Sequence, residues 1–270
     1  MSTAFHIVVC AGPVPDPLQT LEPVTGPAGP SLKNEAMLPA VLDPWAAHAL
    51  YEAAHLAGRT PGSKVWLVSL GPKARLQQLM MTTAQKATFE LVALDGPAGA
   101  FQDAFETGTA LARAIEAIPS LDRSRLLVFG GCASASRDAG ATLAVVGETL
   151  GLGELFLGVD ALTVEADGSL RLLERIEGGR YLVSACAGPP AVLGWATGNL
   201  PEPPNNPQIG MMNMRTILPA LQKATPVAVT AGDAVFSSVE KPGVLRQTRV
   251  VKDLPPDDVA REIAAWIREG

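Results

Sequence analysis

The sequence predicts a doubly wound α/β fold, in which a mostly parallel sheet is covered by helices on both faces. Two observations carry this prediction. Several short runs, such as residues 5–10 and 64–70, are apolar without any polar alternation, and they alternate with amphipathic stretches. Continuous apolar runs are typical of strands covered on both faces, and strand–helix alternation favours right-handed crossovers. At 270 residues and 47% hydrophobic, the chain can bury one large core.

The first half of the chain supplies four strand and helix pairs. The predicted pairs are residues 5–10 with 43–58, 64–70 with 73–85, 88–94 with 103–118, and 125–129 with a helix through Gly151. Asp43 and Pro44 mark the first helix start, because Asp is a good N-cap and Pro fits the first helical position. Residues 18–39 are rich in Pro and Gly and predict a long loop or small hairpin on the surface.

The second half changes character. Residues 159–164, 170–176, 181–185 and 191–194 are closely spaced short runs with turn signals, which predict antiparallel additions to the sheet. Residues 244–251 predict an edge strand, and residues 257–268 a capped amphipathic helix. We therefore expect an α/β domain over residues 1–220 and an extended C-terminal arm over 221–270, whose helix packs on a partner subunit or on its own domain.

Near the end of the first part lies a stretch rich in Pro and Asn, residues 199–212. Each proline removes a backbone donor and fixes φ, so the stretch predicts neither a strand nor a continuous helix. We expect an ordered surface excursion that no core requires. A disordered linker is the alternative, but Ile209, Met211, Met212 and Met214 are too apolar for a solvated tether.

Two loops after predicted strands are candidate ligand sites, because ligands bind at the carboxyl ends of strands in open α/β sheets. One is residues 11–17, which begin Ala-Gly-Pro. The other is residues 130–136, whose small side chains permit close backbone approach before a helix start that attracts anions. A proline-stiffened turn and a small-residue turn packed on a neighbour remain alternative interpretations of these two loops.

Composition and motifs argue against several classes of function. A net charge of -6 without Lys or Arg clusters argues against nucleic-acid binding. Three separated cysteines predict neither disulfides nor a zinc site and favour the cytoplasm, while apolar runs are too short for a membrane span and no signal peptide is expected. His48 and His55 are expected to be packing residues. We find no catalytic constellation and predict no metal site.

Five motifs, taken in order, resemble the β subunit of electron-transfer flavoproteins over most of the chain. VVCAGPVPDP is similar to the family's VxVKxVPD, LDPWAAHALYEAA to NPxDxxALEEA, and VWLVSLGP to a strand ending in GP. LLERIEGG is similar to REIDGG, and ATGNLPEPPNNPQIGMMNM to DLRLNEPRYxxLPxIMKAK. The fold implied is Rossmann-like and similar to adenine-nucleotide hydrolases.

The resemblance implies a heterodimer in which a larger α subunit holds most of an FAD and this chain covers the flavin. It also implies AMP, or a second FAD, at the strand ends. The cofactor-binding candidates are Cys10, Ala11, Gly12, Asp43, Leu70, Gly71, Gly130, Gly131, Ala133, Ser134, Ser136, Arg137 and Asp138. The candidates near the flavin and subunit interface are Arg175, Glu177, Gly178 and Tyr181.

In the family a recognition loop docks a partner dehydrogenase through a leucine. The resemblance places that loop at residues 199–214, with docking candidates Leu200, Gln208, Ile209, Met211 and Met212. The chain departs from the family pattern at several positions. Gly12 and Pro13 replace a basic pair, Asp43 replaces an Asn, and Arg175 replaces an acidic residue. These changes weaken the expectation of AMP binding and favour a specialised partner dehydrogenase.

The leading hypothesis is thus an electron carrier that passes electrons from a dehydrogenase, through the shared FAD, to an acceptor such as a quinone reductase. The flavin would supply the redox chemistry and the protein its burial, orientation and docking. A nucleotide-binding or scaffolding protein without redox function is the alternative. A hydrolase on the same frame would need a nucleophile and base that the sequence does not reveal.

Overall fold

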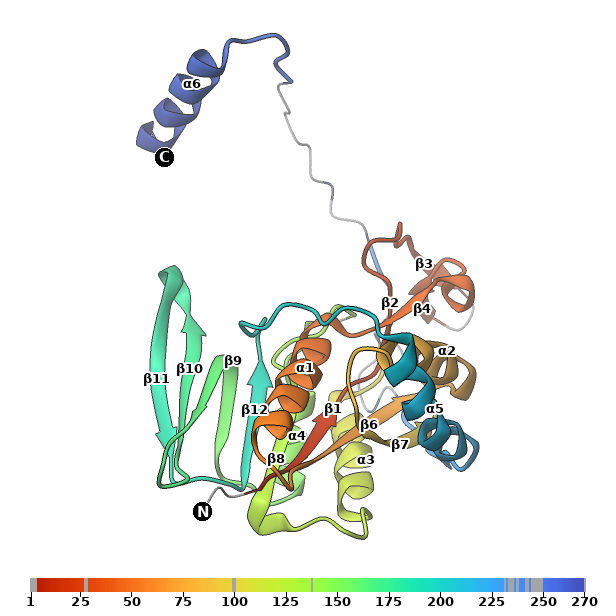
Figure 1. The fold of residues 1–270 in the computed structure, drawn as a ribbon. Coiled ribbons are helices and arrows are strands. Elements are labelled where there is room, and N and C mark those ends of the chain that lie inside the picture. The colour runs from red at the N-terminus through yellow and green to blue at the C-terminus, as the bar shows by residue number, and fades with distance from the viewer. Residues whose placement is uncertain are drawn as a thin grey trace. The chain divides into compact units, whose positions relative to one another are not determined.

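The computed structural model describes residues 4–26, 29–98, 101–136, 138–230, 232, 236, 238–240, 243 and 250–269. The chain divides into two units, Met1–Val239 and Glu240–Gly270. In the described residues of the first unit, one nine-stranded sheet has the order β11-β10-β9-β12-β8-β1-β6-β7-β13 (Figure 1). Its strands are β1 (His6–Cys10), β6 (Lys64–Gly71), β7 (Glu90–Asp95), β8 (Leu126–Gly131), β9 (Leu155–Val164), β10 (Leu170–Ile176), β11 (Arg180–Cys186), β12 (Ala191–Trp195) and β13 (Thr225–Pro226).

The other elements surround this sheet. Two small antiparallel pairs precede the first helix: β2 (Pro13–Pro15) with β5 (Ala40–Leu42), and β3 (Pro23–Gly26) with β4 (Gly29–Leu32). The second pair is the small hairpin predicted within residues 18–39. The helices are α1 (Pro44–Arg59), α2 (Lys73–Thr83), α3 (Ala104–Glu116), α4 (Thr142–Thr149), α5 (Pro207–Gln222) and α6 (Pro256–Glu269), with 3-10 turns at Glu35–Met37, Arg123–Arg125 and Glu177–Gly179.

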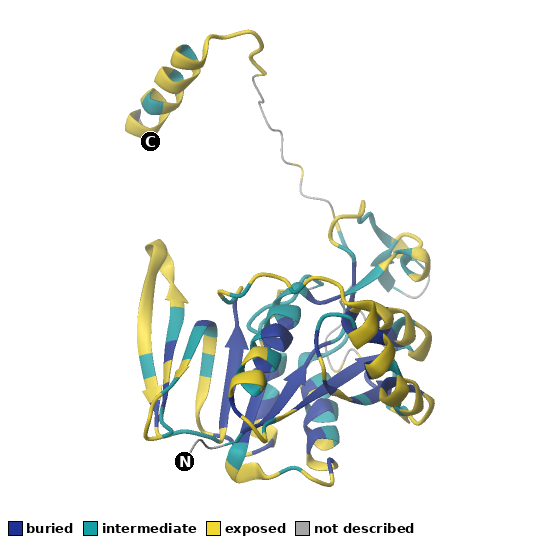
Figure 2. Cartoon of the chain, viewed as in Figure 1, coloured by how far each residue is buried: buried dark blue, intermediate teal, exposed yellow. Residues whose placement is uncertain are grey.

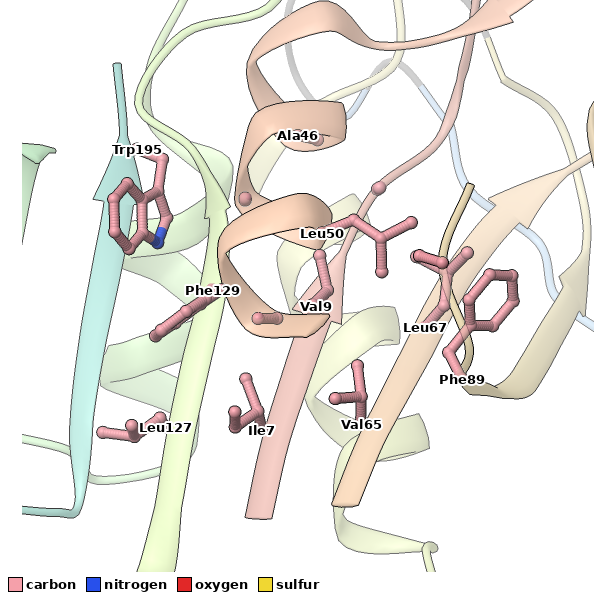
Figure 3. Packing of buried hydrophobic residues seen from close by; sticks show 14 of the residues in the cluster. Ile7, Val9, Ala46, Leu50, Val65, Leu67, Phe89, Leu127, Phe129 and Trp195 are labelled. Carbon is pink, nitrogen blue, oxygen red and sulfur yellow. The ribbon is translucent and has the colours of Figure 1, made fainter. Parts of the chain in front are cut away.

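Side-chain alternation along β1 shows why the sheet is covered twice. Ile7 and Val9 pack with residues of α1, α2 and α5, whereas Val8 and Cys10 pack with residues of α3 and α4. Figure 3 shows the first of these layers, with Leu50 of α1 directed toward β1 and its neighbouring strands. The prediction of a doubly wound, mostly parallel sheet is confirmed, since β12, β8, β1, β6 and β7 pair in parallel.

The antiparallel additions are narrower than predicted. Residues 191–194 belong to β12, which pairs in parallel with β8 and with the first half of β9, so this run is part of the parallel sheet. The second half of β9 pairs antiparallel with β10, and β10 with β11. Gly158, at φ +80, lies where β9 changes between these two partners. Most of β11 is exposed (Figure 2).

The largest correction concerns residues 199–214, because residues from Pro207 onward form helix α5. Asn206 caps this helix: its Oδ1 accepts the N–H groups of Gln208 at 3.1 Å and Ile209 at 3.2 Å. The core does use this segment, since Gly210, Asn213 and Ile217 are buried. The helix expected directly after residues 130–136 was also wrong in its start, because α4 begins only at Thr142.

The second unit, Glu240–Gly270, contains α6, which matches the predicted helix over 257–268. Its apolar positions Val259, Ile263, Trp266 and Ile267 are all more than 40% exposed. Residues 244–249 of the predicted edge strand lie outside the described residues. The boundary between domain and arm at residue 220 stays a prediction.

Candidate functional site: a crevice at the strand ends and a docking segment

A crevice lies at the carboxyl ends of β1, β6 and β8. β1 sits between β6 and β8, and the chain leaves it toward β6 and later returns to its other side as β8. This reversal is the point at which an open α/β sheet leaves room between its strand-end loops. The cavity measures about 200 Å³, which holds a small ligand or on the order of ten waters.

Ten of the thirteen predicted cofactor-binding residues line this crevice: Cys10, Ala11, Gly12, Asp43, Leu70, Gly130, Gly131, Ala133, Ser134 and Ser136. Gly71 and Asp138 are not among the lining residues, and Arg137 lies outside the described residues. A Cβ on Gly71 would lie 2.7 Å from the Pro13 side chain, which accounts for that glycine by packing. Asp138 instead occupies a left-handed turn at φ +57.

Asp43 ties the loop after β8 to helix α1. Its Oδ2 accepts the N–H of Ala135 at 2.8 Å, while its Oδ1 caps α1 by accepting the N–H of Trp45 at 3.1 Å. Burial raises the pKa of the Asp43 carboxyl, although these backbone donors oppose the shift. The carboxylate therefore serves as a bracket between the loop after β8 and the start of α1.

Gly130 and Gly131 have little room for a side chain. A Cβ on Gly131 would lie 2.6 Å from Cβ of Trp45, and one on Gly130 would lie 3.0 Å from Cδ1 of Leu143. The interpretation of this loop as a small-residue turn thus has direct support. Ser134 and Ser136 share a hydrogen bond of 2.8 Å between their hydroxyl oxygens within it.

The electrostatics of the crevice favour a neutral ligand group over a phosphate. Among its described lining residues, Asp43 carries the one ionisable carboxyl, and none is Lys, Arg or His. The start of α4, at Ala141 without a side-chain cap, offers backbone N–H groups as the remaining anion-attracting feature. The apolar walls and hydroxyls fit a nucleoside, but this part of the chain supplies no cation for its phosphate.

The hairpin of β10 and β11 is fixed to the end of β12 by Arg175. Its Nε and Nη2 each donate to the Asp160 carboxylate at 2.9 Å, and Nη2 also donates to Oγ1 of Thr197 at 2.7 Å. Asp160 is 1% exposed, so Arg175 satisfies a buried charge. Of the other predicted interface residues, Glu177 and Gly178 form the turn between the two strands, and Tyr181 is 49% exposed on β11.

The predicted docking residues occupy two different structures. Leu200 lies in the segment between β12 and α5, and Gln208 lies in the first turn of α5. Ile209, Met211 and Met212 are 38%, 69% and 69% exposed on that helix. The helix is fixed beneath them, because Nδ2 of Asn213 donates to the carbonyls of Ala84 at 2.8 Å and Ala87 at 2.9 Å. Ile209, Met211 and Met212 thus lie on a helix that is hydrogen-bonded to the rest of the domain.

A comparison with known protein families gives one match that includes most of the crevice and all of the predicted docking residues. The family model described as the electron transfer flavoprotein domain matches residues 34–234, which include Asp43, the hairpin and the predicted docking residues. The chain belongs to the electron transfer flavoprotein domain family. No curated protein matches the chain.

The flavoprotein domain match begins after β1 and ends before α6. Cys10, Ala11 and Gly12 therefore complete the crevice from outside the matched range. Burial raises the pKa of the Cys10 thiol to about 12. Within the described residues no helix is both long and apolar enough to cross a membrane.

Sequence reasoning missed one wall of this flavoprotein-domain crevice. Pro97 and Gln102 line it from the segment between β7 and α3, Thr107 lines it from the first turn of α3, and residues 139–143 line it before and within α4. Asp103 was a usable signal: it caps α3 by accepting the N–H groups of Phe105 and Glu106, and this helix follows β7 at the same edge of the sheet. The loop over residues 137–141 carried no comparable signal.

Proposed function

We propose that this chain is the β-type subunit of a heterodimeric electron-transfer flavoprotein. It would take up electrons from a specialised dehydrogenase into an FAD held jointly with an α subunit and deliver them to an acceptor such as a quinone reductase. The observation that carries the proposal is the family match across residues 34–234. The cytoplasm is the proposed compartment, in keeping with three free cysteines.

In this proposal the flavin lies mainly on the α subunit, and this chain contributes a covering surface. The exposed side chains of Tyr181 and Val183 lie on one face of β11 and that of Leu182 on the other, so both faces of this strand offer apolar side chains to that subunit. Arg175 supports it by fixing the hairpin to the body of the sheet. Bound flavin would supply the one-electron and hydride chemistry, and the protein would supply orientation and exclusion of water.

The crevice is the proposed site for a second ligand. Its described lining accepts an adenosine through apolar walls and hydroxyls but meets a phosphate with the Asp43 carboxylate. We therefore expect AMP to bind weakly or not at all. The same observation favours one alternative function, a non-redox scaffold on this frame with a decayed nucleotide site.

Co-purification tests the redox proposal against the scaffold alternative. The chain is produced together with an electron-transfer flavoprotein α subunit, and the complex is examined for flavin absorbance. A flavin-containing heterodimer is expected. A heterodimer without flavin absorbance would overturn the redox proposal. Thermal-shift titrations with AMP, ADP and FAD, on the chain alone and in the complex, then identify any ligand of the crevice.

Docking is proposed to use the exposed face of α5. Met211→Ala and Met212→Ala should each lower the rate of electron transfer from the partner dehydrogenase, because flexible methionines suit contacts that form and release. Both side chains are 69% exposed, so the free energy of unfolding should change by less than about 0.5 kcal/mol. Ile209→Ala should act in the same direction.

The control for these variants is Met81→Ala on α2, which is 59% exposed and outside the proposed docking residues. It should leave the transfer rate unchanged. Flavin content, measured by absorbance, should match the wild type in all four variants. Equal transfer rates in the three docking variants and the wild type would place docking on another surface.

A further inference from the structure

We call residues Thr197–Asn206, which lie between β12 and α5, the strap. It contains no helix or strand. Pro201, Pro203 and Pro204 restrict its backbone and lower the entropy of its free state. A segment of this kind keeps one shape only if contacts with the body of the protein hold it.

Glu52 of α1 provides the first of these contacts. Its Oε1 accepts the N–H of Asn199 at 3.3 Å, and the backbone amide of Leu200 lowers the pKa of the same carboxyl. Gly198, at φ +63, permits the approach, because a Cβ there would lie 2.8 Å from Oε1 of Glu52. The carboxylate thus clamps two successive amides of the strap onto a helix that is distant in sequence.

The opposite end of the strap is fixed to the turn after α2. The N–H of Asn206 donates to the carbonyl of Gln85 at 3.0 Å, and Lys86 pairs with Glu202 near the middle. At its start, Oγ1 of Thr197 accepts a hydrogen bond from Arg175. Both ends are therefore held, and Glu52 holds the two amides that enter the proline-rich part.

Holding the strap with Glu52 costs free energy, because burial removes water from its carboxylate. Glu52 lies in the middle of α1 and is partly buried, and burial raises the pKa of its carboxyl despite the strap amides and nearby His55. A desolvated charge needs compensation from hydrogen bonds. In the described part of the chain, the donors that compensate it are the N–H groups of Asn199 and Leu200.

We infer that Glu52 is a positioning residue for partner docking: its carboxylate holds the strap so that Leu200 and the first turn of α5 present one preformed surface. This inference rests on the proposed docking role of residues 199–214. The strap is ordered when the protein folds, so the partner does not have to order it on binding. The occupant of this surface is a dehydrogenase that offers an apolar pocket to Leu200 or Ile209.

The test compares Glu52→Ala, which removes the acceptor, with Glu52→Gln, which keeps an acceptor oxygen. Amide hydrogen exchange at Asn199 and Leu200 is measured on the full chain. Exchange should accelerate about tenfold or more in Glu52→Ala and much less in Glu52→Gln. Glu106→Ala is the matched control, because the Glu106 carboxylate likewise accepts a backbone N–H, from Thr230, in another part of the fold.

The second measurement uses the flavin-containing heterodimer and its partner dehydrogenase. Glu52→Ala should raise the apparent KM for the heterodimer about tenfold, with kcat and flavin content unchanged, and Glu52→Gln should restore most of the affinity. Unchanged exchange at Asn199 and Leu200 would overturn the clamp. Faster exchange with an unchanged KM would overturn the positioning role. A complex without flavin would overturn the proposed function alone, because the exchange measurement does not depend on it.

Discussion

Helix α1 holds two loops that belong to different proposed sites, and it holds each through one carboxylate. Asp43 binds the N–H of Ala135 above the crevice, and Glu52 binds the amides of Asn199 and Leu200 in the strap. Burial raises the pKa of both carboxyls. The two contacts are similar in chemistry but differ in what else each carboxylate does.

Asp43 has a role within its own helix, because it caps the first turn of α1. Its presence is explained by local structure, so it indicates little about a ligand. Glu52 caps no helix, and the desolvation of its charge is compensated by amides of the strap alone among the described hydrogen bonds. A costly contact without a local role is the stronger indication of function, and this makes the strap the better supported of the two sites.

The largest expected effect concerns Arg175, which binds the buried Asp160 carboxylate and Thr197 at the start of the strap. The described lining of the crevice contains no Lys, Arg or His. Arg175→Ala should lower the free energy of unfolding by about 3 kcal/mol, because it leaves the Asp160 carboxylate buried without its partner. Chemical denaturation measures the change. Arg171→Ala is the control, since Arg171 and Glu165 form an exposed pair at 2.8 Å and should lose less than about 1 kcal/mol.

The next effect concerns the crevice bracket. Asp43→Ala should lower the free energy of unfolding by about 2 kcal/mol, because it removes the cap of α1 and the acceptor for Ala135. Asp43→Asn should cost less, since Asn caps helices as well as Asp does, although its amide nitrogen cannot accept the N–H of Ala135. Denaturation and amide exchange at Ala135 measure both variants. Equal damage from Asn and Ala would show that the hydrogen bond to Ala135, and not the cap of α1, carries the stabilisation.

Helices α1 and α5 show how far local sequence determines this fold. Each begins with an Asx–Pro pair, Asp43-Pro44 and Asn206-Pro207, and in each the Asx side chain accepts N–H groups of the first turn. The first start was predicted. The second was not predicted, because the prolines before Asn206 are typical of an irregular segment. The same Asx–Pro signal nevertheless stands before both helices.

The site divides in a similar way. Residues that end parallel strands, such as Cys10 and Gly130, were predictable because such strands share an edge of the sheet. The walls at Gln102 and Thr142 were not, because their positions depend on where two loops return to the sheet. One of these loops is held by a contact between residues distant in the sequence, since the N–H of Asp103 donates to the carbonyl of Thr230. The contact of Glu52 with Asn199 was not predictable for the same reason, because the two residues are distant in the sequence.

The smallest effect is a difference in titration. The pKa values of Asp43 and Glu52 are raised by burial, so the folded protein binds these two protons more tightly than the unfolded chain does. Their contribution to stability is fully present below the unfolded pKa values, about 3.9 and 4.3, and is lost as the pH rises through the folded values. Asp122 is the contrast, because hydrogen bonds from Ser124 lower its pKa and its contribution is lost as the pH falls.

Carboxyl-carbon NMR titration should therefore place the midpoints of Asp43 and Glu52 above those reference values and that of Asp122 below. Glu52→Gln should remove one raised midpoint and leave that of Asp43 in place. A Glu52 midpoint in the ordinary range would mean that the strap amides offset the cost of burial, because hydrogen bonds to a carboxylate lower its pKa. Amide exchange at Asn199 and Leu200 would then decide whether the clamp exists, and the titration would separate only Asp43 from Asp122.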